Sequence, residues 1–177
     1  DQGAHRRDRI ALIGLRGAGK STLGRRLAAE LGFHFVELDA EIERDTGMPM
    51  GEIFALYGQA GYRRIEQRCL RQVLERSEPL VLAASGGIVS QTDTYDLLLS
   101  RCLTIWLRTT PEEHMQRVTA QGDLRPMAGS DEAMEDLRRI LVAREQQYLR
   151  ADHVIDSTGH SEDDSFQAVR AAVTLNA

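Results

Sequence analysis

The sequence predicts an α/β fold in which a central parallel sheet lies between two layers of helices. Two observations carry this prediction. Three apolar runs, at residues 10–13, 80–83 and 103–107, do not alternate with polar residues, as expected of strands buried on both faces. Segments with helical periodicity separate these runs, so strands and helices alternate along the chain, which is typical of βαβ units.

The remaining elements follow from shorter patterns. Two further strands are expected at residues 33–38 and 153–156. Apolar residues recur at helical spacing until Pro79 ends one run, and Pro111 with two following glutamates suits the first turn of another helix. The predicted helices cover residues 21–31, 65–74, a segment that begins at 111, 132–150 and 166–173.

Length and composition describe one globular domain. The chain has 177 residues, of which 42% are hydrophobic and 28% charged. We expect residues 10–177 to form a single domain and residues 1–9 to be a linker or N-terminal extension. The net charge of −5 argues against direct binding of this chain to nucleic acid. No apolar run is long enough to span a membrane. Cys69 and Cys102 are expected to be buried thiols, which fits a cytoplasmic protein.

One loop carries the strongest functional motif in the chain. Residues 14–21 satisfy the G-x-x-x-x-G-K-[ST] pattern between a predicted strand and a predicted helix, which is the context that this phosphate-binding loop requires. Its lysine, Lys20, is the single lysine among 22 basic residues, which argues against a chance match. Lys20 is expected to reach nucleotide phosphates and the Ser21 hydroxyl to ligate Mg²⁺. The predicted phosphate-binding residues are Gly14, Gly17, Ala18, Gly19, Lys20, Ser21 and Thr22. The predicted fold is therefore a three-layer αβα P-loop NTPase fold.

Two carboxylates, Glu37 and Asp39, follow the second predicted strand. Ligands of doubly wound folds lie outside the carboxyl ends of the strands. The pair is therefore a candidate to bind Mg²⁺ through water and to accept a substrate hydroxyl or its proton. A structural role explains Asp39 equally well, because an aspartate at this position can cap a helix over residues 40–44.

Three arginines are candidates for anion binding. Arg63 precedes a helical apolar pattern and can hold a carboxylate in bidentate fashion. Residues 121–131 are polar, contain Gly and Pro, and are too many for a plain connector, so they are predicted to form a lid. Arg125 in this lid is placed to stabilise a transferring phosphoryl group, and Arg144 lies on the following helix. A solvated position is the alternative for each of the three.

Taken in order, these motifs resemble the shikimate kinase family over about residues 9–156. The resemblance is carried by residues 14–22, Glu37-Leu38-Asp39, Tyr62-Arg63-Arg64-Ile65-Glu66, Ser85-Gly86-Gly87, Leu124-Arg125-Pro126-Met127, and Arg144 four residues before Tyr148. It implies a domain that binds ATP with Mg²⁺ and, in an active enzyme, transfers the γ-phosphoryl group to the shikimate 3-hydroxyl.

The resemblance also implies roles by position. Asp39 would contact the ring hydroxyls of the substrate and receive the proton of the attacking one. Arg63 and Arg144 would hold the substrate carboxylate, and Gly86 and Gly87 would let backbone N–H groups approach the substrate. The implied catalytic residues are Lys20, Asp39 and Arg125, with Arg125 also on the phosphates. The implied metal-binding residues are Ser21 and Glu37.

Two positions depart from the family's pattern. The family usually has Asp-x-Asp where this chain has Glu37-Leu38-Asp39, and three glycines where it has Ser85-Gly86-Gly87. The longer Glu37 can still reach a water on Mg²⁺. Ser85 adds a side chain where the family has bare backbone, so we expect a narrowed or reshaped substrate pocket.

A narrower resemblance leads to the main functional prediction. Residues 10–20, 106–115 and 120–129 resemble the regulators of aerobic benzoate degradation, which join a helix-turn-helix DNA-binding domain to a shikimate-kinase-like domain that responds to benzoyl-CoA. We therefore expect a sensor domain that binds a nucleotide or acyl-CoA and reaches DNA only through an upstream domain, with residues 1–9 as the linker. The alternatives are an active shikimate kinase or another small-molecule P-loop kinase, such as a gluconate kinase. The sequence is compatible with a homodimer.

Overall fold

Five parallel strands form the central sheet of the computed structural model, which describes residues 6–120 and 130–175. The strand order is β2–β3–β1–β4–β5, and every neighbouring pair is parallel. The strands are β1 (Arg9–Ile13), β2 (His34–Glu37), β3 (Leu80–Ala83), β4 (Leu103–Arg108) and β5 (His153–Asp156). The predicted parallel sheet is confirmed, with each strand within one residue of its expected bounds.

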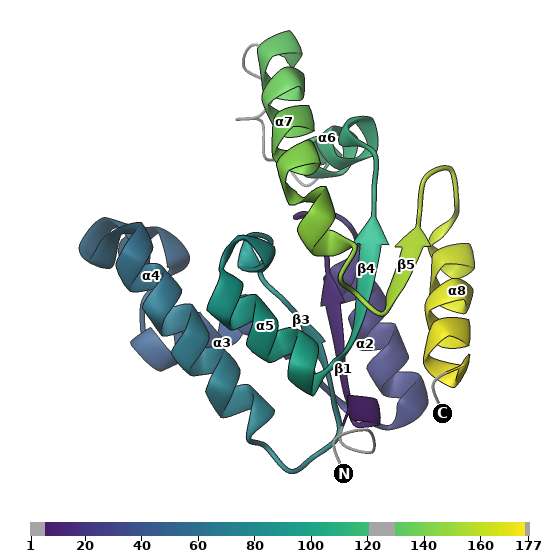
Figure 1. Ribbon diagram of the computed structural model, residues 1–177, viewed down its shortest axis with the longest axis horizontal. Helices are drawn as coiled ribbons and strands as arrows, with labels where there is room; N and C mark the ends of the chain where they lie inside the picture. Colours follow the sequence, from purple (N-terminus) through teal and green to yellow (C-terminus); the bar gives the residue numbers. More distant parts are fainter. Residues whose placement is uncertain (1–5, 121–129, 176–177) are drawn as a thin grey trace.

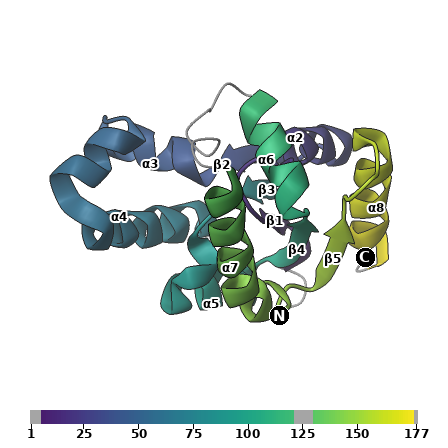
Figure 2. The ribbon, with the colours of Figure 1, turned by 90° about the horizontal axis from the view of Figure 1, so that it is seen from above.

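Two layers of helices cover the sheet (Figure 1), so the predicted three-layer architecture is also confirmed. One layer consists of α2 (Lys20–Leu31) and α8 (Glu162–Leu175). The other contains α3 (Leu38–Thr46), α4 (Met50–Leu74) and α5 (Thr92–Arg101), as the view from above in Figure 2 shows. Each face of the sheet has its own hydrophobic core, with Leu12 and Leu27 buried on the α2 side and Ile13 and Leu70 on the α4 side.

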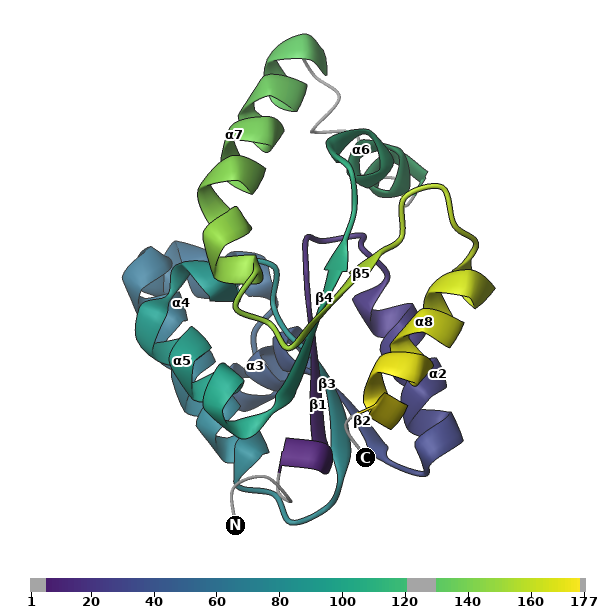
Figure 3. The same cartoon turned by 45° about the vertical axis from the view of Figure 1, so that its right-hand side comes forward.

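Two helices, α6 (Pro111–Ala120) and α7 (Ser130–Tyr148), project beyond the carboxyl ends of the strands (Figure 3). The predicted lid joins them, and its residues 121–129 lie outside the described part of the chain. The base of α7 is fixed by Tyr148, which is fully buried and stacks on Trp106 with ring centroids 4.8 Å apart. Arg144 stands one helical turn before Tyr148, so this anchor directs Arg144 toward the ends of the strands.

The largest differences between the expected and the observed helices are in α4 and α5. Helix α4 begins at Met50 rather than near residue 65, and it bends at Gly58, whose φ of 68° interrupts the helical backbone. Helix α5 was not predicted, because ten residues with only Thr94, Tyr95 and Leu98 buried give too short an apolar stripe to show a clear period. None of the helices formed by the described residues has the length and apolar character of a transmembrane segment.

Candidate functional site

The loop between β1 and α2 has the backbone that the glycine-rich motif predicts. Gly14, Gly17 and Gly19 all have positive φ, at 149°, 82° and 98°. A Cβ on Gly14 would lie 2.7 Å from the carbonyl oxygen of Leu107, so no side chain fits there. The glycines therefore let the chain turn tightly and present the N-terminus of α2 to a ligand.

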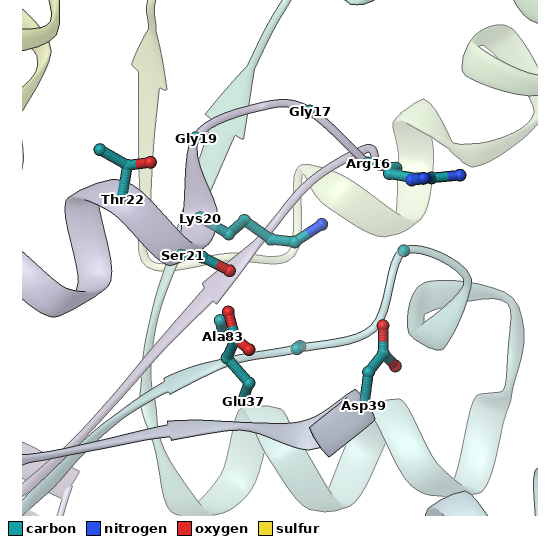
Figure 4. Close-up of a pocket in the computed structure, with 11 residues that line it drawn as sticks. Arg16, Gly17, Gly19, Lys20, Ser21, Thr22, Glu37, Asp39 and Ala83 are labelled. Atoms are coloured by element: carbon teal, nitrogen blue, oxygen red, sulfur yellow. The ribbon is translucent and has the colours of Figure 1, made fainter. Parts of the chain in front are cut away.

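A cavity of about 420 Å³ opens beside this loop at the carboxyl ends of β2 and β3. Figure 4 shows the Lys20 side chain and the Ser21 hydroxyl side by side on one wall of the cavity, with Glu37 and Asp39 on the facing wall. The structure thus brings the predicted phosphate loop and the predicted carboxylate pair to one place. The residues that line the cavity are Arg16, Gly17, Gly19, Lys20, Ser21, Thr22, Glu37, Asp39, Ala83, Ala84 and Gly86.

Lys20 is held within its own loop. Its Nζ donates hydrogen bonds to the carbonyl oxygens of Gly14, at 2.5 Å, and Leu15, at 3.1 Å. Burial lowers the pKa of Lys20 to about 8; Asp39 opposes this shift and the positive charge of Arg144 adds to it. The ammonium is therefore a desolvated charge beside a cavity, where a phosphate group would be a stronger partner than backbone carbonyls.

Asp39 lies in the first turn of α3 and does not cap that helix. Helix α3 begins at Leu38, its N-cap residue is Glu37, and no side chain makes the cap hydrogen bond. The expected alternative role of Asp39 as a helix cap is therefore wrong. Burial raises the pKa of the Asp39 carboxyl; Lys20 lowers this pKa, whereas Glu66 raises it. A carboxylate with a raised pKa beside a cationic group is suited to receive a proton during a reaction.

Glu37 ends β2 and lines the cavity together with Ser21. Its carboxylate also forms a 3.4 Å ion pair with Arg25. Within residues 6–120 and 130–175, no group of three His, Cys, Asp or Glu side chains is arranged to hold a metal ion. A cation at this site would therefore need further oxygen ligands, and the phosphates of a nucleotide can supply them.

Arg63 and Arg144 converge on the turn formed by residues 85–87. Arg63 Nη1 donates to both oxygens of Glu66, at 3.0 and 3.2 Å, and its Nε is buried without a hydrogen-bond partner. Arg144 Nη1 donates to the carbonyl oxygen of Gly86 at 3.2 Å. Neither arginine has the simple solvated position that was the alternative, since Arg63 is only 19% exposed and Arg144 contacts the turn.

The turn itself differs from expectation at Ser85. This side chain is buried and does not line the cavity, because its hydroxyl donates a hydrogen bond to Glu66. The expected narrowing of the pocket at Ser85 is therefore wrong. Gly87 leaves room for the Arg63 side chain, since a Cβ at position 87 would lie 2.6 Å from Arg63 Nη2. Glu66 is the residue whose role was missed; a signal for it is an acidic residue three positions after Arg63 on a helix face that is otherwise apolar.

Three other residues of the predicted site are Ala18, Thr22 and Arg125. The side chain of Ala18 is buried in the core, and its backbone N–H donates to the carbonyl oxygen of Leu15 at 3.1 Å, so in this structure it closes the loop. Arg125, the predicted lid arginine, lies outside the described residues. Thr22 lines the cavity, and its role in phosphate binding stays a prediction.

Comparison with known proteins places these features in one family. The shikimate kinase family model matches residues 16–174. The shikimate kinase of Nitrobacter winogradskyi is 40% identical over 148 residues, which cover 84% of this chain and 68% of the relative. That of Parasynechococcus marenigrum is 38% identical over 81% of this chain and 74% of its own.

Solved structures agree with the sequence comparisons. The shikimate kinase of Acinetobacter baumannii, solved in complex with shikimate, superposes with a TM-score of 0.83 and 33% identity over 95% of this chain and 93% of its own. The shikimate kinase of Bacteroides thetaiotaomicron gives a TM-score of 0.84 and 29% identity over 94% and 98% of the two chains.

These comparisons overturn the main functional prediction. The expected sensor domain of a benzoate regulator is wrong, because the likeness over most of the chain is to shikimate kinases and none of these comparisons points to a regulator, to DNA or to benzoyl-CoA. Residues 16–21 of the P-loop, the carboxylate pair and the two arginines at the 85–87 turn all lie within the matched region. The chain belongs to the shikimate kinase family.

Proposed function

We propose that this chain is an active shikimate kinase, which transfers the γ-phosphoryl group of ATP to the 3-hydroxyl of shikimate. The observation that carries the proposal is the meeting of Lys20 and Asp39 at one cavity, with two arginines held beside it. It is supported by the family membership and by the relative from Acinetobacter baumannii that was solved with shikimate.

The P-loop binds the nucleotide, ATP. Backbone N–H groups around Gly17 and Gly19 and the N-terminus of α2 bind the phosphates, and Lys20 exchanges its two carbonyl partners for phosphate oxygens. Mg²⁺ arrives with ATP as part of the substrate and neutralises charge between its phosphates. The Ser21 hydroxyl and the Glu37 carboxylate, both on the cavity wall, are hard oxygen donors of the kind that Mg²⁺ prefers.

Asp39 and the two arginines bind the acceptor substrate, shikimate. Arg63 and Arg144 bind the carboxylate of shikimate and thereby direct the ring toward the cavity. The 3-hydroxyl oxygen forms a bond to the γ-phosphorus, the bond from that phosphorus to the β,γ-bridging oxygen breaks, and ADP leaves. Asp39 receives the hydroxyl proton, a role suited to its raised pKa. Arg125 is proposed to stabilise the transferring phosphoryl group.

Steady-state turnover with a small set of acceptors tests this proposal. ADP release is measured with shikimate, with shikimate methyl ester, with gluconate and with no acceptor. We expect turnover with shikimate, and a KM for the methyl ester at least about tenfold higher, because the ester cannot form charged hydrogen bonds with the arginines. Preferred turnover of gluconate, or ADP release that no acceptor accelerates, would contradict the assignment.

A further inference from the structure

The turn after β3 contacts both arginines of the proposed substrate site. The carbonyl oxygen of Gly86 accepts the hydrogen bond of Arg144, and the missing side chain of Gly87 leaves room for Arg63 Nη2. Ser85, the first residue of the turn, donates its hydroxyl hydrogen to Glu66. Glu66 in turn accepts both hydrogen bonds from Arg63 Nη1.

Because Glu66 is buried, its carboxylate needs hydrogen-bond donors from the protein. Its side chain has no exposure to solvent, so its carboxylate oxygens depend on protein donors alone. One oxygen, Oε2, accepts hydrogen bonds from the Ser85 hydroxyl, from Arg63 Nη1 at 3.2 Å and from the Tyr62 hydroxyl at 3.4 Å. The other oxygen, Oε1, accepts a hydrogen bond from Arg63 Nη1 at 3.0 Å. Among the described residues, Ser85 is thus the donor to Glu66 that comes from outside helix α4, and it links the helix to the turn after β3.

This arrangement decides which edge of the Arg63 guanidinium is available. Because Glu66 engages Nη1, Nη2 is the end of the guanidinium that is left for another anion, whereas Nε is buried and has no hydrogen-bond partner among the described residues. A carboxylate accepts a charged hydrogen bond from such a group. The Tyr62 ring, 5.1 Å from the centre of the guanidinium, and the backbone at Gly87 limit how far Arg63 can turn.

We propose that Ser85 is a positioning residue for substrate binding: through Glu66 it sets the orientation of Arg63, so that Nη2 faces the carboxylate of the acceptor. The proposal rests on the proposed function for the identity of that acceptor. The Ser85 hydroxyl acts on Arg63 only through Glu66. Without it, Glu66 Oε2 loses a donor, and the carboxylate and the arginine bound to it can rotate together.

The test compares Ser85→Ala and Ser85→Gly with the wild-type chain. Both variants lose the hydroxyl, and the second also restores the family's usual residue. We expect the KM and Kd for shikimate to rise about five- to tenfold in both, which is the scale of one ordinary hydrogen bond, because Ser85 acts on the substrate only through Glu66 and Arg63. We expect kcat and the KM for ATP to change less than about twofold. Thr104→Val is the matched control, because it removes a fully buried hydroxyl near the opposite end of the sheet.

A double-mutant cycle shows whether Ser85 acts through Glu66. In a Glu66→Gln background, Ser85→Ala should no longer change the Kd for shikimate, because the contact that it removes already lacks its charged acceptor. Three results would each overturn the proposal: an unchanged Kd in Ser85→Ala, a normal Kd in Ser85→Gly alone, or equal effects of Ser85→Ala in both backgrounds.

A measurement that needs no substrate separates this proposal from the proposed function. If the wild-type chain neither binds nor phosphorylates shikimate, the proposed function fails, and Ser85 is judged by the Arg63 Nε–H resonance in ¹⁵N NMR, assigned from its loss in Arg63→Lys. We expect Ser85→Ala to shift or broaden this resonance and Thr104→Val to leave it unchanged. An identical Arg63 signal in wild type and Ser85→Ala would refute the positioning role.

Discussion

Raising the pH from 7.5 to 9 should weaken nucleotide binding, because Lys20 loses its proton over this range. In the unliganded chain, burial lowers the pKa of Lys20 to about 8. A group with that pKa is about 75% protonated at pH 7.5 and about 10% protonated at pH 9. Phosphate groups beside the ammonium raise its pKa in the complex, so the protonated form is the one that binds. The affinity should therefore fall about eightfold, which corresponds to about 1.2 kcal/mol.

Calorimetry with Mg²⁺ and a non-hydrolysable ATP analogue measures this effect directly. Titrations in two buffers of different ionisation enthalpy give the protons taken up on binding, which we expect to rise from about a quarter per nucleotide at pH 7.5 to about nine-tenths at pH 9. Burial raises the pKa of Cys69 to about 11 and that of Cys102 to about 12, so neither thiol titrates in this range.

Lys20→Arg is the matched control, since it keeps a positive charge that does not titrate below pH 9. Its proton uptake at pH 9 should fall close to zero, even if its affinity is lower overall. A wild-type affinity that stays constant from pH 7.5 to 9 would refute the reasoning. Proton uptake that persists unchanged in Lys20→Arg would also refute the reasoning, because a group other than Lys20 would then take up the proton when the phosphates bind.

Three further substitutions test separate parts of the site. Asp39→Asn should lower kcat about 10²- to 10⁴-fold in steady-state assays, because the amide cannot receive the hydroxyl proton; a variant with normal kcat would remove Asp39 from catalysis. Gly87→Ala should raise the Kd for shikimate about tenfold and leave ADP binding unchanged, because its Cβ would lie 2.6 Å from Arg63 Nη2; equal losses for both ligands would instead indicate a general disturbance. Tyr148→Ala should lower the free energy of unfolding in urea by about 3–5 kcal/mol, because the ring is fully buried and stacked on Trp106; a loss below about 1 kcal/mol would show that this stack does not anchor α7.

The parts of the fold that the sequence predicts well are those determined by local patterns. The strand at residues 80–83 is found at its expected bounds, since a continuous apolar run leaves few alternatives. The strand at residues 153–156 is found at its expected bounds too, although only its two central residues are apolar. The phosphate loop is predicted for the same reason, because its glycine and lysine spacing lies within eight residues. Helix α5 and the first half of α4 escape prediction because their apolar positions are few or interrupted by a bend at Gly58.

The contacts that organise the substrate site could not be predicted, because they join residues far apart in the chain. Ser85 and Glu66 are 19 positions apart, and Arg144 and Gly86 are 58 positions apart. From the sequence alone, Ser85 was expected to point into the pocket, whereas its hydroxyl turns away toward a buried carboxylate. The functional prediction failed for a different reason: it gave most weight to three short stretches, while the likeness over most of the chain is to kinases.

Transfer of phosphate from ATP to shikimate, followed by ³¹P NMR, tests the central claim most directly. The chain is incubated with Mg²⁺, ATP and shikimate, and Asp39→Asn serves as the inactive control. We predict that a phosphomonoester signal grows together with ADP, at about 1–100 turnovers per second, which is the range of kinases. No such signal should appear without shikimate. If ATP stays intact, or yields only ADP and inorganic phosphate whether or not shikimate is present, the chain is not a shikimate kinase in function and the account of its site is contradicted.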